Sequence, residues 1–181
     1  NGVRDRMKII ISPAKKMNIR EDELEWANLP CFLSRAEELK RYIQGLDLDQ
    51  ARKLWQCNEK IALLNYGRFK EMDLERRLTP ALLSYEGIQY QYMAPGVFEQ
   101  GQWDYVQEHL RILSGFYGIL KPLDGIVPYR LEMQAKVELP SGIKSLYDYW
   151  GSSICRELAA DETLIVNLAS KEYSRAVEPY L

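Results

Sequence analysis

Hydrophobic positions along the chain follow two different spacings, one typical of strands and one of helices. A short apolar run at 8–11 predicts a strand, which Ser12 and Pro13 end because proline removes a donor from the ladder. Thr79 followed by Pro80 predicts a helix start, with Thr79 as the N-cap and proline in the first turn. Apolar residues at helical spacing predict helices near 32–43, 49–56, 60–72, 81–85 and 103–113.

Two further segments have strand-like patterns in the second half of the chain. At 129–134, Tyr129, Leu131 and Met133 alternate with polar residues, which predicts a half-buried strand. At 163–168 the residues are almost continuously apolar, which predicts a central strand. Helices and strands are segregated and do not strictly alternate, so the pattern favours an α+β fold with a mixed sheet surrounded by helices.

Length and composition favour one globular domain spanning 7–181, because 181 residues with 46% hydrophobic positions can bury a substantial core. No apolar run approaches the roughly 20 residues needed to cross a bilayer, and the start of the chain lacks the apolar stretch of a secretory signal. We therefore expect a cytoplasmic protein without a membrane partner. Residues 1–6 have no periodicity, and we interpret them as an added or frayed extension.

The residue types that usually bind metals are scarce. Cys31, Cys57 and Cys155 are widely spaced, which supports neither a disulfide framework nor a metal knuckle. His109 is the single histidine, so we predict no metal site and no cofactor. The net charge of −2 does not favour nucleic acid at the level of the whole chain, and any basic surface has to be local.

Polar residues that follow the predicted strands are candidates for a ligand site. Ser12 and Lys15 follow the first strand, where a lysine and backbone amides can meet a phosphate or carboxylate; the alternative is a tight turn with a solvated lysine. Arg130 and Glu132 share one face of their segment, where they either line a cleft or face solvent as ordinary charges.

Two other groups have the same two interpretations. Lys121 and Asp124 form a charge pair at a proline-containing turn, and turn chemistry alone explains such residues equally well. After the apolar run at 163–166, a second polar group follows, where ligands often bind beyond buried strands. A capping turn before a helix is the alternative for this group, which comprises Asn167, Ser170, Lys171 and Glu172.

Several motifs resemble one known family. They are Ile9-Ile-Ile-Ser-Pro-Ala-Lys15, Leu113-Ser-Gly-Phe-Tyr-Gly-Ile-Leu-Lys-Pro-Leu-Asp124, Pro128-Tyr-Arg-Leu-Glu-Met133, Leu146-Tyr-Asp-Tyr-Trp-Gly151 and Val166-Asn-Leu-Ala-Ser-Lys-Glu-Tyr173. In this order they resemble the YaaA family of peroxide-stress proteins (DUF328, UPF0246). The resemblance implies the core of the YaaA fold and favours a ligand role for Ser12 and Lys15. Family members continue past the position of Leu181, so we expect a chain shortened at its C-terminal end.

The resemblance also implies a helix-hairpin-helix motif and a positively charged cleft that bind DNA. The best candidate for the motif is 49–72, where Arg52, Lys53, Lys60 and Arg68 are the expected DNA-binding residues. The hairpin at 56–60 lacks the usual glycines, and Glu59 places a negative charge where phosphate approaches. From its residues alone the segment is a plain helical hairpin.

The function implied by the resemblance is binding of double-stranded DNA, without sequence specificity, in a response that limits iron- and peroxide-dependent DNA damage. An enzyme acting on a nucleotide or other phosphorylated small molecule is the alternative, with Lys15, Arg130 and Lys171 as cations and Glu132 as candidate general base. An iron-handling protein ranks last, since only carboxylates remain as ligands.

Overall fold

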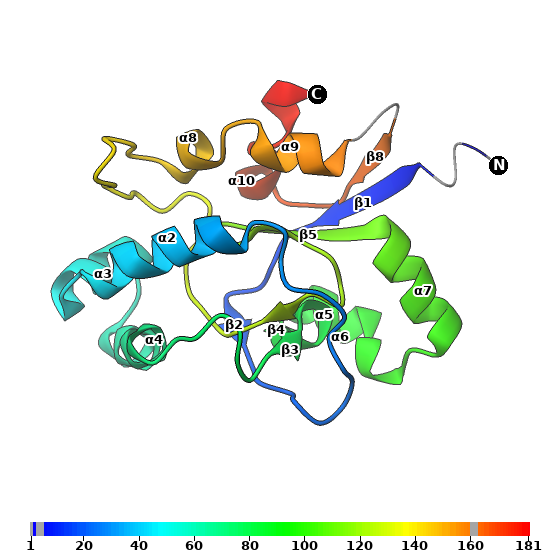
Figure 1. Cartoon of the computed structure of the whole chain (residues 1–181), viewed down its shortest axis with the longest axis horizontal. Coiled ribbons are helices and arrows are strands. Elements are labelled where there is room, and N and C mark those ends of the chain that lie inside the picture. Colours follow the sequence, from blue (N-terminus) through cyan, green and yellow to red (C-terminus); the bar gives the residue numbers. More distant parts are fainter. Residues whose placement is uncertain (1, 3–5, 160–162) are drawn as a thin grey trace.

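A four-stranded sheet lies at the centre of the computed structural model, which describes residues 2, 6–159 and 163–181. Its strand order is β6-β5-β1-β8, with β1 at Met7–Ile11, β5 at Leu110–Ser114, β6 at Gly118–Leu120 and β8 at Leu164–Asn167. β1 pairs in parallel with both β5 and β8, whereas β5 and β6 are antiparallel. The sheet is therefore mixed, and the predicted α+β class is confirmed (Figure 1).

Two small antiparallel sheets join distant segments beside the central sheet. β2 (Lys16–Met17) pairs with β4 (Tyr85–Glu86), and β3 (Thr79–Pro80) pairs with β7 (Gly125–Ile126). The β2–β4 pair holds the chain that leaves β1 against the middle of the sequence. The segment that contains Ser12 and Lys15 lies between β1 and β2, so both of its ends are fixed by strand pairing.

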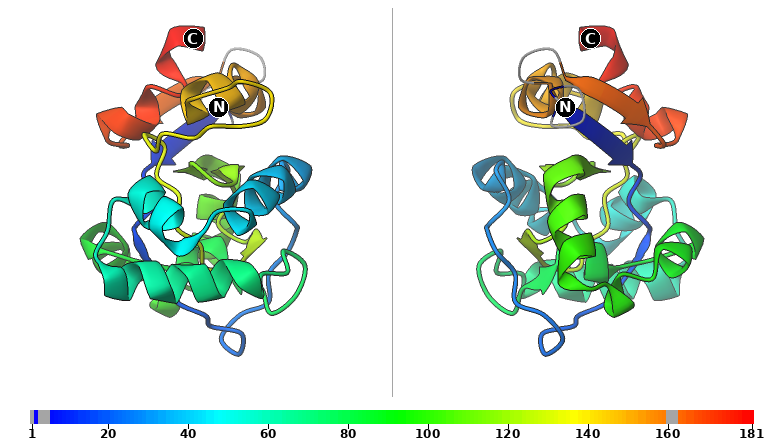
Figure 2. Two further views of the ribbon diagram at one scale, coloured as in Figure 1. Left: turned by 90° about the vertical axis from the view of Figure 1, so that its left-hand side faces the viewer. Right: turned by 90° about the vertical axis from the view of Figure 1, so that its right-hand side faces the viewer.

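Helices surround the sheets on several sides (Figures 1 and 2). Polar caps start the two helices of the hairpin, because Asp47 accepts from the backbone N–H of Gln50 and Asn58 accepts from that of Ile61. The helices are α2 (Leu33–Gln44), α3 (Leu48–Trp55), α4 (Glu59–Lys70), α5 (Ala81–Ser84), α6 (Ile88–Met93), α7 (Gln100–His109), α8 (Leu146–Trp150), α9 (Ser153–Leu158) and α10 (Lys171–Ser174), with 3-10 turns at η1 (Pro95–Val97) and η2 (Glu178–Tyr180). Among the described residues, no helix is long and apolar enough to span a membrane.

The sequence patterns located most elements but assigned some of them wrongly. The first strand and the two hairpin helices are confirmed. Thr79 is in β3 and does not cap a helix, and the apolar spacing at 103–113 ends as a helix at His109 because Leu110 begins β5. The strand predicted as central is β8, which lies at the edge of the sheet and leaves Leu164 half exposed.

The segment 129–132 is extended but pairs with no strand, and Met133 and Gln134 lie in a turn, so the strand predicted at 129–134 is wrong. Its side chains nevertheless alternate as predicted: Tyr129, Leu131 and Met133 are buried, while Arg130 and Glu132 are partly exposed on the other side. Burial of the apolar side chains produces this alternation without a ladder. The segment therefore presents its two charged residues on one face.

Candidate functional site

A cavity of about 160 Å³ lies where β1 and β8 end. Because the two strands are parallel, their carboxyl ends meet at the same edge of the sheet, where ligand sites of α/β sheets commonly form. The loop after β1, the extended segment and the start of α10 contribute its walls. The lining residues are Ser12, Pro13, Ala14, Lys15, Tyr129, Arg130, Leu131, Glu132, Ser170, Glu172 and Tyr173.

Two serines join the loops at the mouth of this cavity. The backbone N–H of Ser170 donates to Oγ of Ser12 at 2.8 Å, and the Ser12 hydroxyl lies 3.2 Å from that of Ser170. The hydroxyl of Tyr90 donates to the carbonyl of Ser12 at 2.8 Å, which holds the loop from a second direction. The cavity is therefore preformed by contacts between segments far apart in the sequence.

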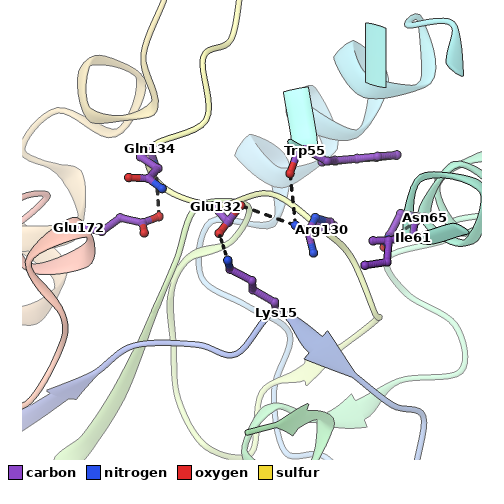
Figure 3. A network of polar contacts seen from close by, with 8 residues as sticks. All are labelled: Lys15, Trp55, Ile61, Asn65, Arg130, Glu132, Gln134 and Glu172. Carbon is purple, nitrogen blue, oxygen red and sulfur yellow. Dashed lines mark hydrogen bonds and ion pairs between the residues drawn. The ribbon is translucent and has the colours of Figure 1, made fainter. Parts of the chain in front are cut away.

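Glu132 lies between the two cations of the cavity (Figure 3). Its carboxylate is 3.1 Å from Nζ of Lys15 and 3.9 Å from Nη2 of Arg130. The Lys15 side chain is 69% exposed, whereas that of Arg130 is only 10% exposed. Lys15 is thus a mobile surface cation that a ligand can draw away, while Arg130 is held in a fixed position.

Arg130 also connects the cavity to the helical hairpin. Its Nη2 donates to the carbonyl of Trp55, the last residue of α3, at 3.2 Å (Figure 3). Two buried donors in this region, Nε of Arg130 and Nε1 of Trp55, have no acceptor among the described residues. Both atoms are sealed from solvent, and an unpaired buried N–H costs roughly 1–3 kcal/mol.

Glu172 is the second carboxylate of the cavity. Its Oε2 accepts from the backbone N–H of Gln134 at 3.3 Å, and the hydroxyl of Tyr147 donates to its carbonyl oxygen at 2.6 Å. Burial raises the pKa of the Glu172 carboxyl, and the nearby charge of Glu132 raises it further. The two carboxylates thus differ in environment, since Glu132 faces two cations.

The extended segment is placed by close packing against the turn after β5. A Cβ on Gly115 would lie 2.6 Å from the carbonyl oxygen of Leu131, so only glycine admits the backbone of the segment at this distance. The hydroxyl of Tyr129 lies 2.7 Å from Oγ of Ser114 and 2.6 Å from the hydroxyl of Tyr85. The motif at 113–124 is therefore largely core that supports the cavity from behind.

Three of the sequence-predicted residues lie elsewhere. Asn167 donates to Oε1 of Glu178 and accepts from the N–H of Ala169, which is a turn before α10, and the N-cap Ser170 makes no side-chain capping bond. Lys171 is exposed and does not line the cavity. Lys121 lines a separate cavity of about 80 Å³ with Asp124, whose carboxylate accepts from the Lys121 N–H.

The four candidate DNA-binding cations of the hairpin differ in exposure and in hydrogen bonding. Arg52 donates to the carbonyl of Cys57 within the hairpin, and Arg68 is half-buried, donating to the carbonyl of Met17. Burial lowers the pKa of Arg68. Lys53 and Lys60 are exposed. In the described part of the chain no three His, Cys, Asp or Glu side chains gather as a metal site requires.

Comparison with known proteins shows the family. The model of the peroxide stress protein YaaA matches residues 7–180. The chain belongs to this family. A UPF0246 protein of Desulfitobacterium hafniense is 57% identical, over 97% of this chain and 69% of its own length. Agathobacter rectalis and Lachnoclostridium phytofermentans have UPF0246 proteins that are each 53% identical over 97% of this chain, covering 70% and 68% of their lengths.

Membership of the YaaA family supports a role in peroxide stress and agrees with the resemblance found in the sequence. Glu172 lines the cavity, and it belongs to the polar group after 163–166 for which the sequence offered both a ligand site and a capping turn. Helix geometry limits the choice between the two charged residues of this group. Adjacent residues of a helix point about 100° apart, so Lys171 and Glu172 do not both face the cavity. The pattern alone did not determine which of them faces inward.

Proposed function

We propose that this protein acts in the peroxide stress response by binding double-stranded DNA without sequence specificity, which limits iron- and peroxide-dependent damage. The observation that carries the proposal is the bond from Arg130 to Trp55, because it places the cavity directly beside the end of α3. Lys53 and Lys60 are exposed on the hairpin, and Lys15 is exposed at the mouth of the cavity in which Arg130 is buried. Such cations neutralise backbone phosphates without contacting base edges.

The two exposed lysines of the hairpin provide the test. Replacing Lys53 and Lys60 by alanine should weaken binding about equally for duplexes of different sequence, and it should reduce the salt slope of affinity by about 1 per residue. Fluorescence anisotropy at several salt concentrations measures both effects. Arg52 and Arg68 are poorer targets, since each already bonds to a backbone carbonyl.

A charge-matched control is the double replacement of Lys144 and Arg156 by alanine. Both residues are exposed; Arg156 is in α9 and Lys144 lies just before α8, and these helices are across the molecule from α4 (Figures 1 and 2). This variant changes the net charge by the same amount. If both double variants bind DNA with equal affinity and equal salt slope, the hairpin does not contact DNA.

A second candidate function is an enzyme that acts on a nucleotide or another phosphorylated small molecule. It is favoured by the pair of carboxylates in one preformed cavity, where Glu132 faces Lys15 and Arg130, and burial raises the pKa of the Glu172 carboxyl. Two carboxyl groups in different environments can serve as base and acid. In this role Glu132 is the general base, Arg130 holds an acceptor atom of the substrate, and Lys15 at the exposed mouth meets its phosphate.

A further inference from the structure

The cavity combines hydrogen-bond donors and acceptors in a way that limits its ligand. On one side, Arg130 has an N–H without an acceptor among the described residues, and its side chain is nine-tenths buried. On the other side, Glu132 and Glu172 present carboxylate oxygens. A ligand that matches this lining accepts a hydrogen bond from Arg130, which lines the cavity, and also donates hydrogen bonds to the two carboxylates.

A phosphate group alone does not meet this requirement. Its oxygens accept but do not donate when ionised, and they would lie beside two carboxylates in one small cavity. The volume of about 160 Å³ is also below the roughly 300–1,000 Å³ of pockets that hold drug-sized ligands. The space is suited to a single ring system, with any attached sugar or phosphate outside.

We infer that this cavity binds a guanine base through the edge that pairs with cytosine. That edge carries two adjacent donors, N1–H and the N2 amino group, beside the acceptor O6, and proteins recognise unpaired bases through this edge. The two donors fit the carboxylates of Glu132 and Glu172, and O6 accepts from Arg130, a pairing that arginine commonly makes with guanine. Adenine, cytosine and uracil lack two adjacent donors on this edge.

The rest of the cavity agrees with a planar base. Tyr129 and Tyr173 are aromatic wall residues, and Leu131 adds an apolar contact. Lys15 at the exposed mouth can contact the phosphate on the sugar of a nucleotide, because its ion pair with Glu132 is solvent-accessible. The base can come from a free nucleoside or nucleotide, or from a guanine that leaves the DNA stack; only the second source rests on the proposed DNA binding.

Calorimetric titration with the four nucleosides tests the base itself. Guanosine should bind at least about tenfold more tightly than adenosine, cytidine or uridine, because a site built for two donors leaves its carboxylates unpaired with the other bases. Equal affinity for guanosine and adenosine, or no binding of guanosine, would overturn the inference. This comparison uses the unaltered protein and so does not depend on the stability of any variant.

The variant Glu172→Gln tests the role of the second carboxylate. It keeps the size of the side chain but replaces one acceptor by a donor, so guanosine affinity should fall at least about tenfold. Glu178→Gln is the matched control, since Glu178 is exposed on the same C-terminal segment and does not line the cavity. Unchanged guanosine affinity in a folded Glu172→Gln protein would contradict the assignment.

Duplexes with one unpaired base separate the two sources. If the base comes from DNA, a duplex with an unpaired guanine should bind about tenfold more tightly than one with an unpaired thymine. If guanosine binds but the two duplexes bind equally, the source is a free nucleoside or nucleotide and the base site stands. If guanosine binds and neither duplex does, the proposed DNA binding fails alone. If DNA binds without any preference for guanine, free or unpaired, the base site fails alone.

Discussion

Ser12 and Ser170 are 158 positions apart, yet the backbone N–H of Ser170 donates to the hydroxyl of Ser12 at 2.8 Å. This bond joins the loops that follow β1 and β8, so it closes the cavity on the side of the parallel strands. Neither loop has a local reason to adopt this arrangement. The pairing of the two strands brings their ends together, and the serines then fix the mouth of the cavity.

Replacing Ser12 by alanine removes the acceptor for the Ser170 N–H. We expect the free energy of unfolding to fall by about 1 kcal/mol, a usual value for one hydrogen bond. Urea denaturation measures this change. Ser152→Ala is the control, because Ser152 makes no side-chain capping bond at the start of α9. Equal stability of the two variants would show that the Ser12–Ser170 bond contributes nothing.

The glycine behind the extended segment should tolerate no side chain. In Gly115→Ala the new Cβ would lie 2.6 Å from a backbone oxygen, and we expect a loss of about 2–3 kcal/mol because backbone atoms cannot move aside easily. Gly67→Ala in α4 has no atom within 4 Å of the new Cβ and should stabilise by up to about 1 kcal/mol. Thermal and urea denaturation compare the two. A stable Gly115→Ala protein would argue against this packing.

Stability should depend on the charge of Asp124. Burial raises the pKa of its carboxyl from 3.8 to about 6, so the folded state holds the proton more tightly than the unfolded state. Its contribution is therefore fully present below about pH 4 and is lost as pH rises to about 6, by at most about 3 kcal/mol. Asp124→Asn removes this loss, so its advantage over the unaltered protein should grow between pH 4 and pH 7 in urea titrations. Asp22→Asn, at an exposed position, is the matched control.

Cys31 should react slowly with peroxide, although the residue is exposed. Burial of its sulfur raises the pKa of the thiol to about 12, and only the thiolate is strongly nucleophilic. In a protein with Cys57 and Cys155 replaced by serine, alkylation by iodoacetamide should rise about tenfold per pH unit up to pH 10. A plateau near pH 9 would show a more acidic thiol. Cys31→Ser should leave peroxide survival of cells unchanged.

Glu132→Gln distinguishes binding from catalysis. The change removes a negative charge beside Lys15 and Arg130, so DNA affinity should stay the same or rise modestly, because a carboxylate repels phosphate. In a longer relative from the family, the same variant should abolish peroxide protection if Glu132 is the catalytic base and preserve it if binding suffices. Cell survival, DNA affinity and protein abundance are measured together. Weaker DNA binding by a folded variant would contradict the placement of Glu132 next to phosphate.

Local patterns in the sequence were sufficient for features that depend on neighbouring residues. The strand β1, the two helices of the hairpin and the shared face of Arg130 and Glu132 follow from the spacing of apolar side chains. These features need only to bury one face of a segment. The spacing of apolar residues indicates which side chains point the same way, whatever segment packs against them.

The segments against which each strand or helix packs depend on contacts that form only in the folded protein. The residues at 129–134 have the alternation of a strand but pair with no strand, and the apolar run of β8 lies at a sheet edge. Glu172 faces the cavity because the hydroxyl of Tyr147 and the N–H of Gln134 bind it there. The order of the amino acids alone indicates which residues are charged and which of them share a face. Contacts between distant segments decided which of them meet, because pairing and close packing depend on the whole chain.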